Sequence, residues 1–292
     1  VRIYSHIGSV YIDIPKQEKD RYFVDAAADL WKKWKRPAEG LTVPLGVDQY
    51  KKIVEFSFSN SSSPHLLVGG TTGGGKSEAL YTILSGLLEY YNPDELKLIL
   101  IDPKQVELNN FAQGSYKKYL LESVPPIGHT TLHAIQRLEE CTEEMARRQN
   151  ILSEASNSGR YSGAIKDIAS YNKAVENESR LPWWLIVMDE YYDLISDNEN
   201  KKELENQIKR LASKARAVGI HIIITTQQPT VEVVSSVIRA NLPAQLALKV
   251  NKHTNSTVIM DETGAECLNA KGDAYLKLGG KLRRLQIAMV NR

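Results

Sequence analysis

A glycine-rich segment carries the strongest chemical signal in this sequence. Gly70, Gly75, Lys76 and Ser77 fit the spacing G-x-x-x-x-G-K-[ST] of a phosphate-binding loop. Glycines let backbone N–H groups converge on phosphate oxygens, because a Cβ would obstruct the approach and positive φ would cost energy. An apolar run at 65–68 predicts a strand before the loop. A helix is predicted after it, and this context disfavours the alternative of a turn without a ligand.

This loop predicts a nucleotide site with a divalent cation. Lys76 can reach the β- and γ-phosphates, and the Ser77 hydroxyl can hold Mg²⁺. We therefore expect ATP and Mg²⁺ as the cofactors. The predicted ATP-binding residues are Gly70, Thr71, Thr72, Gly73, Gly74, Gly75, Lys76, Ser77 and Glu78.

Two acids follow a later apolar run, at 183–188. Asp189 is placed at the carboxyl end of this predicted strand, where it can share Mg²⁺ with Ser77. Glu190 beside it can polarise the attacking water. Surface acids at a strand end are the alternative, which the upstream phosphate loop disfavours.

Gln227 and Arg216 complete the set of candidates. Gln227 ends the next apolar run, where an amide can sense the γ-phosphate, although an ordinary loop amide is an alternative. Arg216 lies one position past the apolar residue Ala215. From spacing alone a solvated helix face is the better interpretation. The other is an arginine finger for the ATP of a neighbouring subunit, a group worth about 10³–10⁵ in rate.

The remaining sequence predicts alternating strands and helices. Helices are expected at 76–91, 132–152, 163–175 and 201–218, and strands at 96–101, 183–188, 220–224, 245–250, 274–278 and 285–290. This alternation predicts a doubly wound, mostly parallel sheet. Residues 1–60 contain short apolar runs and a helix at 25–35. We expect them to form an N-terminal extension packed on a domain at 61–292.

Composition limits the classes of partner. The 37 Lys and Arg residues against 35 Asp and Glu give a charge of +2, so nucleic acid could only be bound by a local patch. Cys141 and Cys267 have no ligand-spaced neighbours and are expected to be packed side chains rather than a disulfide or a zinc site. No apolar run reaches the roughly 20 residues of a membrane span. We expect a cytoplasmic location, as a separate protein or as part of a larger or membrane-anchored one.

Several segments together resemble the motor domains of the FtsK/SpoIIIE family. The segments are 65–77, Leu100 to Lys104 with Glu107 and Leu108, Glu144 and Met145 with Arg147 and Arg148, 211–221, 226–229, 240–243, 264–266, and Gly272 with Asp273. They occur in order over about 10–290. The resemblance implies a three-layer α/β domain of RecA type. It also implies an ATP-driven homohexameric ring that pumps double-stranded DNA through its pore.

The resemblance assigns roles position by position. Lys76, Ser77, Asp189 and Glu190 keep their nucleotide roles, and Gln227 matches the γ-phosphate sensor. Arg216 falls where the family has its trans-acting arginine, which reverses the preference from spacing alone.

The DNA-contacting positions depart from the family. Gln228 replaces a pore-loop arginine after the sensor, and His253 and Thr257 occupy the positions of a second basic pair. Lys249, Lys252 and Arg239 could substitute, although solvated charges are equally open. The candidate DNA-binding residues are Gln228, Lys249, Lys252 and His253.

Three alternatives therefore stay open. Coupling proteins of conjugative elements and motor subunits of DNA-restriction systems share the resemblance and also act on DNA. Type VII secretion ATPases share it too, and their cargo is polypeptide. A nucleotide-binding scaffold without turnover is the third, which the presence of Glu190 and Arg216 disfavours.

Overall fold

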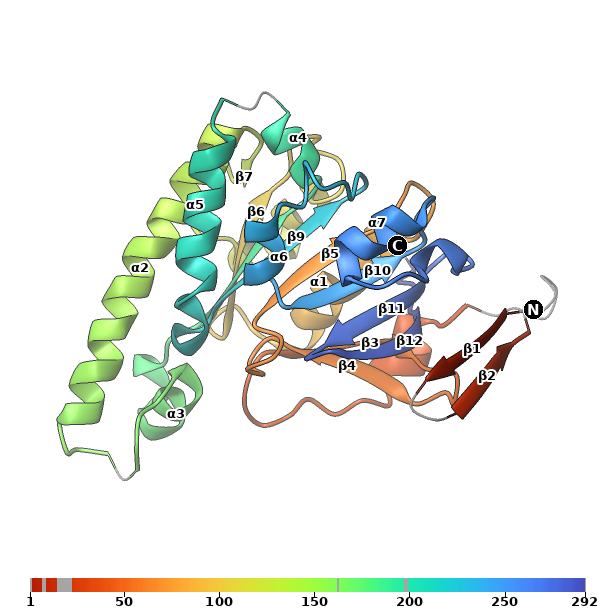
Figure 1. Cartoon of the computed structure of the whole chain (residues 1–292). Helices are drawn as coiled ribbons and strands as arrows, with labels where there is room; N and C mark the ends of the chain where they lie inside the picture. The colour runs from red at the N-terminus through yellow and green to blue at the C-terminus, as the bar shows by residue number, and fades with distance from the viewer. Residues whose placement is uncertain (1, 7–8, 15–22, 162, 197–198, 292) are drawn as a thin grey trace.

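The fold is built on one large mixed sheet. The computed structural model describes residues 2–6, 9–14, 23–161, 163–196 and 199–291. Ten strands follow the order β4-β3-β12-β11-β10-β5-β9-β8-β6-β7 (Figure 1). The predicted strands recur in this sheet, with ends that differ by a few residues.

One side of the sheet is parallel. Its strands are β10 (Ala244–Leu248), β5 (His65–Gly69), β9 (Ile220–Thr226), β8 (Trp183–Met188), β6 (Leu96–Ile101) and β7 (Ile127–Gly128). Most of them are continuous apolar runs, as expected for strands covered on both faces. Because the strands are parallel, their carboxyl ends lie at one edge of the sheet, which we call the carboxyl edge. The opposite end of these strands is the amino edge.

The other side of the sheet is antiparallel. It consists of β4 (Ile53–Ser57), β3 (Thr42–Val47), β12 (Lys281–Ile287) and β11 (Asp273–Leu278), which pairs with β10. Thus β3 and β4, from the predicted extension, extend the main sheet. Strands β1 (Arg2–His6) and β2 (Ser9–Asp13) form a separate two-stranded sheet. Positions 15–22 lie outside the described residues, and a division at residue 60 stays a prediction.

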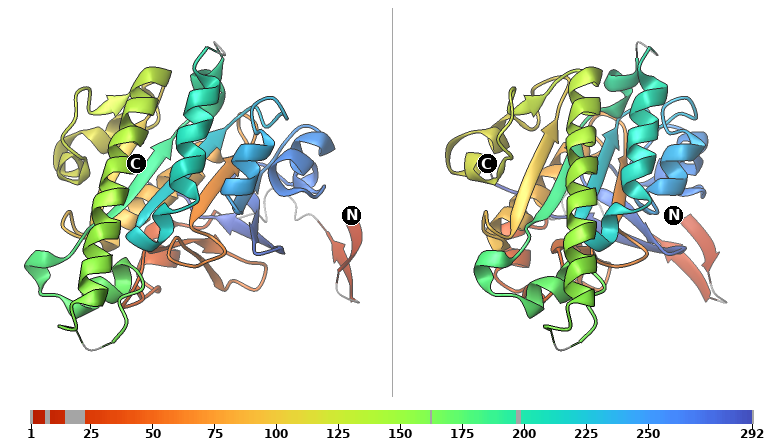
Figure 2. Two further views of the ribbon diagram at one scale, coloured as in Figure 1. Left: turned by 60° about the vertical axis from the view of Figure 1, so that its left-hand side comes forward. Right: turned by 90° about the vertical axis from the view of Figure 1, so that its left-hand side faces the viewer.

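Helices cover both faces of the sheet, which gives the predicted three layers (Figure 2). Helix α1 (Lys76–Tyr90) packs on one face with Leu66 and Val68. Leu67 between them points to the opposite face, where other helices pack. They include α2 (Thr131–Asn157), α5 (Lys201–Ala212), α6 (Ser236–Asn241) and α7 (His253–Met260).

The prediction of one helix at 201–218 is wrong in one respect. Helix α5 ends at Ala212, and a separate 3-10 turn, η6 (Ala215–Val218), precedes β9. The Ala212 carbonyl accepts a hydrogen bond from His65 instead of continuing the helical ladder. Gly219 then closes the turn at φ 74°.

Two other predicted helices are shorter. Helix α3 (Ile168–Ala174) begins five residues into the predicted segment, at an Asp167 capping box with Ser170. The helix at 25–35 is a π-helical turn, η2 (Ala26–Trp31), capped by Asp25.

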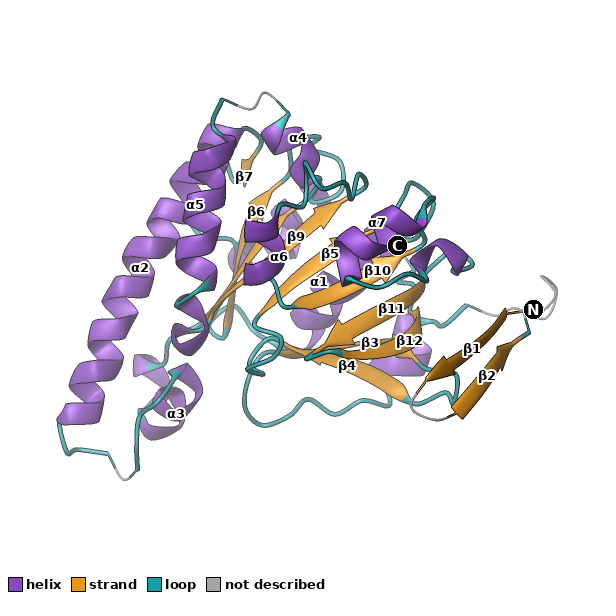
Figure 3. Ribbon diagram, viewed as in Figure 1, coloured by secondary structure: helices purple, strands orange, loops and turns teal. Residues whose placement is uncertain are grey.

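Short elements fill the connections (Figure 3). They are α4 (Tyr191–Ile195) and the 3-10 turns η3 (Asn109–Ala112), η4 (Gly114–Tyr119), η5 (Asn177–Ser179) and η7 (Ala265–Cys267).

The cysteines agree in part with expectation. Both cysteines are free thiols. Cys141 is buried as predicted, whereas Cys267 is exposed and the expectation of a packed side chain is wrong there. Among the helices of the described chain, none combines the length and apolar character needed to span a membrane.

Candidate nucleotide-binding site

The glycine-rich segment forms the turn between β5 and α1 at the carboxyl edge. Gly73 and Gly75 adopt φ 78° and 106°, which favours glycine. A Cβ on Gly75 would lie 2.5 Å from the backbone nitrogen of Gly272. In the described part of the chain no side chain caps α1, so its first N–H groups are available to an anion.

Neighbouring loops hold this phosphate loop in place. Thr71 donates two hydrogen bonds to the Lys249 carbonyl, from its backbone nitrogen at 2.9 Å and its Oγ1 at 3.0 Å. On another side, the Gly272 nitrogen donates to the Gly74 carbonyl at 3.1 Å. The segment after β10, which carries the candidate DNA-binding residues Lys249, Lys252 and His253, is therefore bonded directly to the phosphate loop.

Lys76 lies among buried polar groups. Its Nζ donates to the Asp189 carboxylate and to Thr225 Oγ1, the latter at 3.0 Å, and Glu190 Oε2 is 3.7 Å away. The Thr225 hydroxyl also donates to Asp189. Lys76, Asp189 and Glu190 are at most 3% exposed. Three chain segments thus converge on one point at the carboxyl edge.

Glu190 has a constrained backbone. Its φ of 44° lies in the left-handed region, which is costly for a residue with a side chain. The surrounding contacts hold it there, because its carboxylate accepts from the Gln227 nitrogen at 3.0 Å and from Thr226 Oγ1 at 3.3 Å. The acid predicted to orient water is therefore tied to the segment that carries the predicted sensor.

Two further contacts close the site. Thr72 Oγ1 donates to Gln227 Oε1 at 2.9 Å, which joins the phosphate loop to the sensor. Ser77 Oγ donates to Glu107 Oε1 at 2.6 Å. Glu107 and Thr225 are the site residues that sequence reasoning did not assign. The signal for Thr225 was its place at the end of the apolar strand β9. Glu107 lies beyond the end of β6, and only its place among the segments that resemble the family pointed to it.

Asp102 organises the segment that presents Glu107. Its carboxylate accepts four backbone N–H groups, from Lys104, Gln105, Val106 and Leu108. Lys104 pairs with Asp193 at 3.2 Å. Partial burial lowers the pKa of Lys104, but the hydrogen bond to Asp193 and the charge of Glu190 outweigh it and raise this pKa above its ordinary value.

Arg216 lies at the amino edge, away from these residues. It belongs to η6, just before β9, whereas Gln227 follows the other end of the same strand. At about 3.3 Å per residue, β9 separates the two positions by roughly 20 Å. Arg216 is exposed. It cannot reach the phosphate loop of its own chain.

The candidate DNA-binding residues lie in two loops of the carboxyl edge. Gln228 follows β9, and Lys249, Lys252 and His253 follow β10. All are exposed except Lys249, which is half-buried. Arg239 is committed to an ion pair with Asp261 at 3.0 Å.

The residues present fit a magnesium nucleotide. The uncapped helix start and the two left-handed glycines suit phosphate, and Ser77 with Asp189 supplies hard oxygen ligands. Among the described residues, no group of three or more His, Cys, Asp or Glu is placed so that it could hold a metal ion. A Mg²⁺ site of this class needs none, because substrate phosphates and water complete the coordination.

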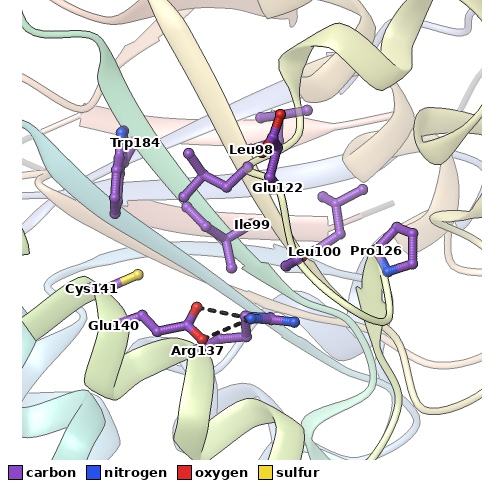
Figure 4. A pocket seen from close by; sticks show the side chains of 11 residues that line it. Leu98, Ile99, Leu100, Glu122, Pro126, Arg137, Glu140, Cys141 and Trp184 are labelled. Carbon is purple, nitrogen blue, oxygen red and sulfur yellow. Dashed lines mark hydrogen bonds and ion pairs between the residues drawn. The ribbon is translucent and has the colours of Figure 1, made fainter.

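A separate cavity of about 240 Å³ lies between β6, α2 and the segment at 121–126 (Figure 4). Ile99, Cys141 and Trp184 contribute apolar walls, and Arg137 pairs with Glu140 beside it at 2.8 Å. Burial raises the pKa of the Cys141 thiol. The lining shares no residue with the candidate nucleotide site.

Comparison with known sequences identifies the family. The FtsK/SpoIIIE family matches residues 27–231. The chain is 35% identical over 269 residues to a DNA translocase FtsK of Borreliella burgdorferi, covering 91% of this chain and 32% of that protein. A DNA translocase FtsK of Leptospira interrogans is 36% identical over 252 residues, covering 83% and 24%. The chain therefore spans a third or less of the length of these relatives.

Solved structures with low sequence identity share the fold. The pCW3 conjugation coupling protein TcpA, solved with ATPγS, gives a TM-score of 0.73 at 22% identity over 99% of this chain and 76% of its own. The cytoplasmic domain of the type VII secretion ATPase EccC of Thermomonospora curvata gives 0.67 at 24%, over 91% and 30%. The three-layer α/β sheet, the phosphate-loop turn and the extended sequence match agree, and the chain belongs to the FtsK/SpoIIIE family.

Proposed function

We propose that this chain is a Mg²⁺-dependent ATPase motor that works as a homohexameric ring in the cytoplasm and moves double-stranded DNA. One observation carries the proposal. Lys76 and Asp189 are buried together at one edge of the sheet, while Arg216 is exposed at the other. A ring places the amino edge of one copy against the carboxyl edge of the next, which completes a site that one copy cannot complete. The relatives named DNA translocase FtsK support the choice of DNA as cargo.

Each residue has one task in this proposal. The loop amides and Lys76 bind the phosphates, and Ser77 with Asp189 would hold Mg²⁺, which neutralises phosphate charge when bound. Glu190 orients water and accepts its proton. Gln227 senses the γ-phosphate. Arg216 of the adjacent copy stabilises the charge of the transition state.

The decisive measurement is ATP turnover with and without linear duplex DNA, repeated over a range of salt. We expect DNA to stimulate turnover, and the stimulation to weaken as salt rises. In Lys249→Gln/Lys252→Gln, the slope of log affinity against log salt should fall by about two. Lys202→Gln/Lys209→Gln, on the exposed surface of α5, is the matched control and should keep the slope.

A polypeptide cargo is the second candidate. The observation that favours it is Gln228, a neutral residue at a position where the resemblance implies arginine. Stimulation by an unfolded polypeptide, together with indifference to duplex DNA, would select this cargo. A purified chain that binds ATP but never turns it over would select the scaffold without catalysis.

A further inference from the structure

Two buried side chains hold the two ends of the segment that carries Arg216. At the first end, His65 Nε2 lies 3.1 Å from the Ala212 carbonyl, where α5 stops. His65 Nδ1 accepts from the Ile222 nitrogen at 3.1 Å, so the ring proton lies on Nε2 and is donated to Ala212. His65 is fully buried and belongs to β5, the strand that leads into the phosphate loop.

Arg148 holds the second end. Its Nη1 donates to the Val218 carbonyl at 2.9 Å and to the Pro182 carbonyl at 2.8 Å. Its Nε donates to Glu144 at 2.7 Å, and its guanidinium lies 4.9 Å from the centre of the Trp184 ring. Arg148 is the largest side chain among those fully buried in the described chain.

Burying an arginine is costly, and an apolar residue of similar size would fill the same volume without that cost. The Arg148 guanidinium therefore acts through the hydrogen bonds that it donates. It fixes the carbonyl at the end of η6, and His65 fixes the carbonyl at the end of α5, on the other side of Arg216. The exposed Arg216 lies between these two attachments.

We propose that His65 and Arg148 are positioning residues for the trans-acting arginine. They set the place and the direction of the turn 212–218, so that Arg216 enters the site of the adjacent copy in a fixed orientation. The inference rests on the proposed trans role of Arg216. An arginine on a turn free to move would lose much of its effect, because catalysis by charge depends on groups held in advance.

The first test is Arg148→Met, measured in the whole chain with Mg-ATP and linear duplex DNA. We expect turnover to fall at least tenfold, while ATP affinity stays within about twofold, since the phosphate loop is at the other edge. Arg147→Met is the matched control. Arg147 is exposed on the same helix and pairs with the same Glu144, and among the described residues it donates no hydrogen bond to the turn.

Mixed rings separate positioning from general damage. Arg148→Met keeps its own phosphate loop, and Lys76→Ala keeps its own Arg216 turn. Mixing the two impaired variants should therefore give turnover above that of either one alone, because some interfaces join an intact phosphate loop to an intact Arg216 turn. A variant whose fold is merely damaged would not be rescued in this way.

The outcomes are distinct. Normal turnover in Arg148→Met, or equal loss of ATP binding and turnover without rescue, overturns the inference. If Arg148→Met does not fold, Arg148→Lys and His65→Leu are scored by the same mixing criterion. Mixing Lys76→Ala with Arg216→Ala tests the proposed function separately. If that mixture gives no turnover, the trans role itself is refuted, whatever Arg148 does.

Discussion

The two edges of the parallel sheet are built in opposite ways. At the carboxyl edge Lys76, Asp189 and Glu190 are themselves buried. Hydrogen bonds join Lys76 to Asp189, and Glu190 to the half-buried Gln227. At the amino edge Arg216 is exposed, and the buried groups are its supports, His65 and Arg148. The first arrangement suits a site that receives a ligand, and the second suits a group that is presented to another molecule.

This difference predicts different costs for substitution. Removing one partner of a buried ion pair leaves an uncompensated charge, which destabilises the fold as well as the site. Removing an exposed arginine costs the fold little. Substitutions at the carboxyl edge should therefore lower stability and activity together. Substitution of the exposed Arg216 should lower activity and leave stability unchanged.

The largest expected effect is that of Lys76→Ala. We expect ATP binding and turnover to be lost together, because the phosphates lose their cation and Asp189 loses its buried partner. Calorimetric titration with ATP and a turnover assay measure this. Turnover at the normal rate would refute the assignment of the site.

Arg216→Ala should reduce turnover nearly as much as Lys76→Ala does, but it should leave ATP binding and thermal stability unchanged. We expect a loss of about 10³–10⁵ in kcat, with ATP affinity and melting temperature unchanged. Full activity of this variant, or full activity of a monomer of the natural chain, would contradict the trans assignment.

Acid should weaken the amino edge. Burial lowers the pKa of His65 to about 4 and that of His221 to about 3, from an ordinary 6.5. The unfolded chain then binds more protons than the folded one, so the free energy of unfolding falls as pH decreases from about 6.5 towards 4. The contribution of His65 is roughly 3 kcal/mol. Urea titrations between pH 7 and pH 4.5 measure it.

His65→Leu should flatten this pH dependence by about one proton. His253→Gln, an exposed position, is the control and should leave the curve as it is. An unchanged slope in His65→Leu would show that this histidine is not the group that titrates.

The smallest expected effect concerns Thr72→Val. It removes the hydrogen bond to Gln227 that joins the phosphate loop to the sensor. A single neutral hydrogen bond is worth about 0.5–1.5 kcal/mol, so we expect kcat to fall by roughly two- to tenfold with little change in KM. Thr72→Ser keeps the hydroxyl and should retain most of the rate. Equal losses in both variants would argue against the bond.

The sequence predicted the carboxyl edge better than the amino edge. Long apolar runs such as Trp183–Met188 identify buried strands, and the residues that follow them must share one edge. The end of α5 could not be predicted in this way. The helical pattern continues past Ala212, and the bond that ends the helix comes from His65, 147 positions away. Glu107 was missed for a related reason, since only the turn around Asp102 brings it to Ser77.

The pair of hydrogen bonds from Thr71 to the Lys249 carbonyl has a mechanical consequence under the proposed function. The phosphate loop and the loop proposed to contact DNA are hydrogen-bonded to each other directly, through the Lys249 carbonyl, with no other element between them. Through so short a connection, a movement of the phosphate loop would displace the loop after β10 by a small distance and without delay. A glycine inserted after Lys249 should loosen this connection. ATP hydrolysis would then continue without movement of DNA.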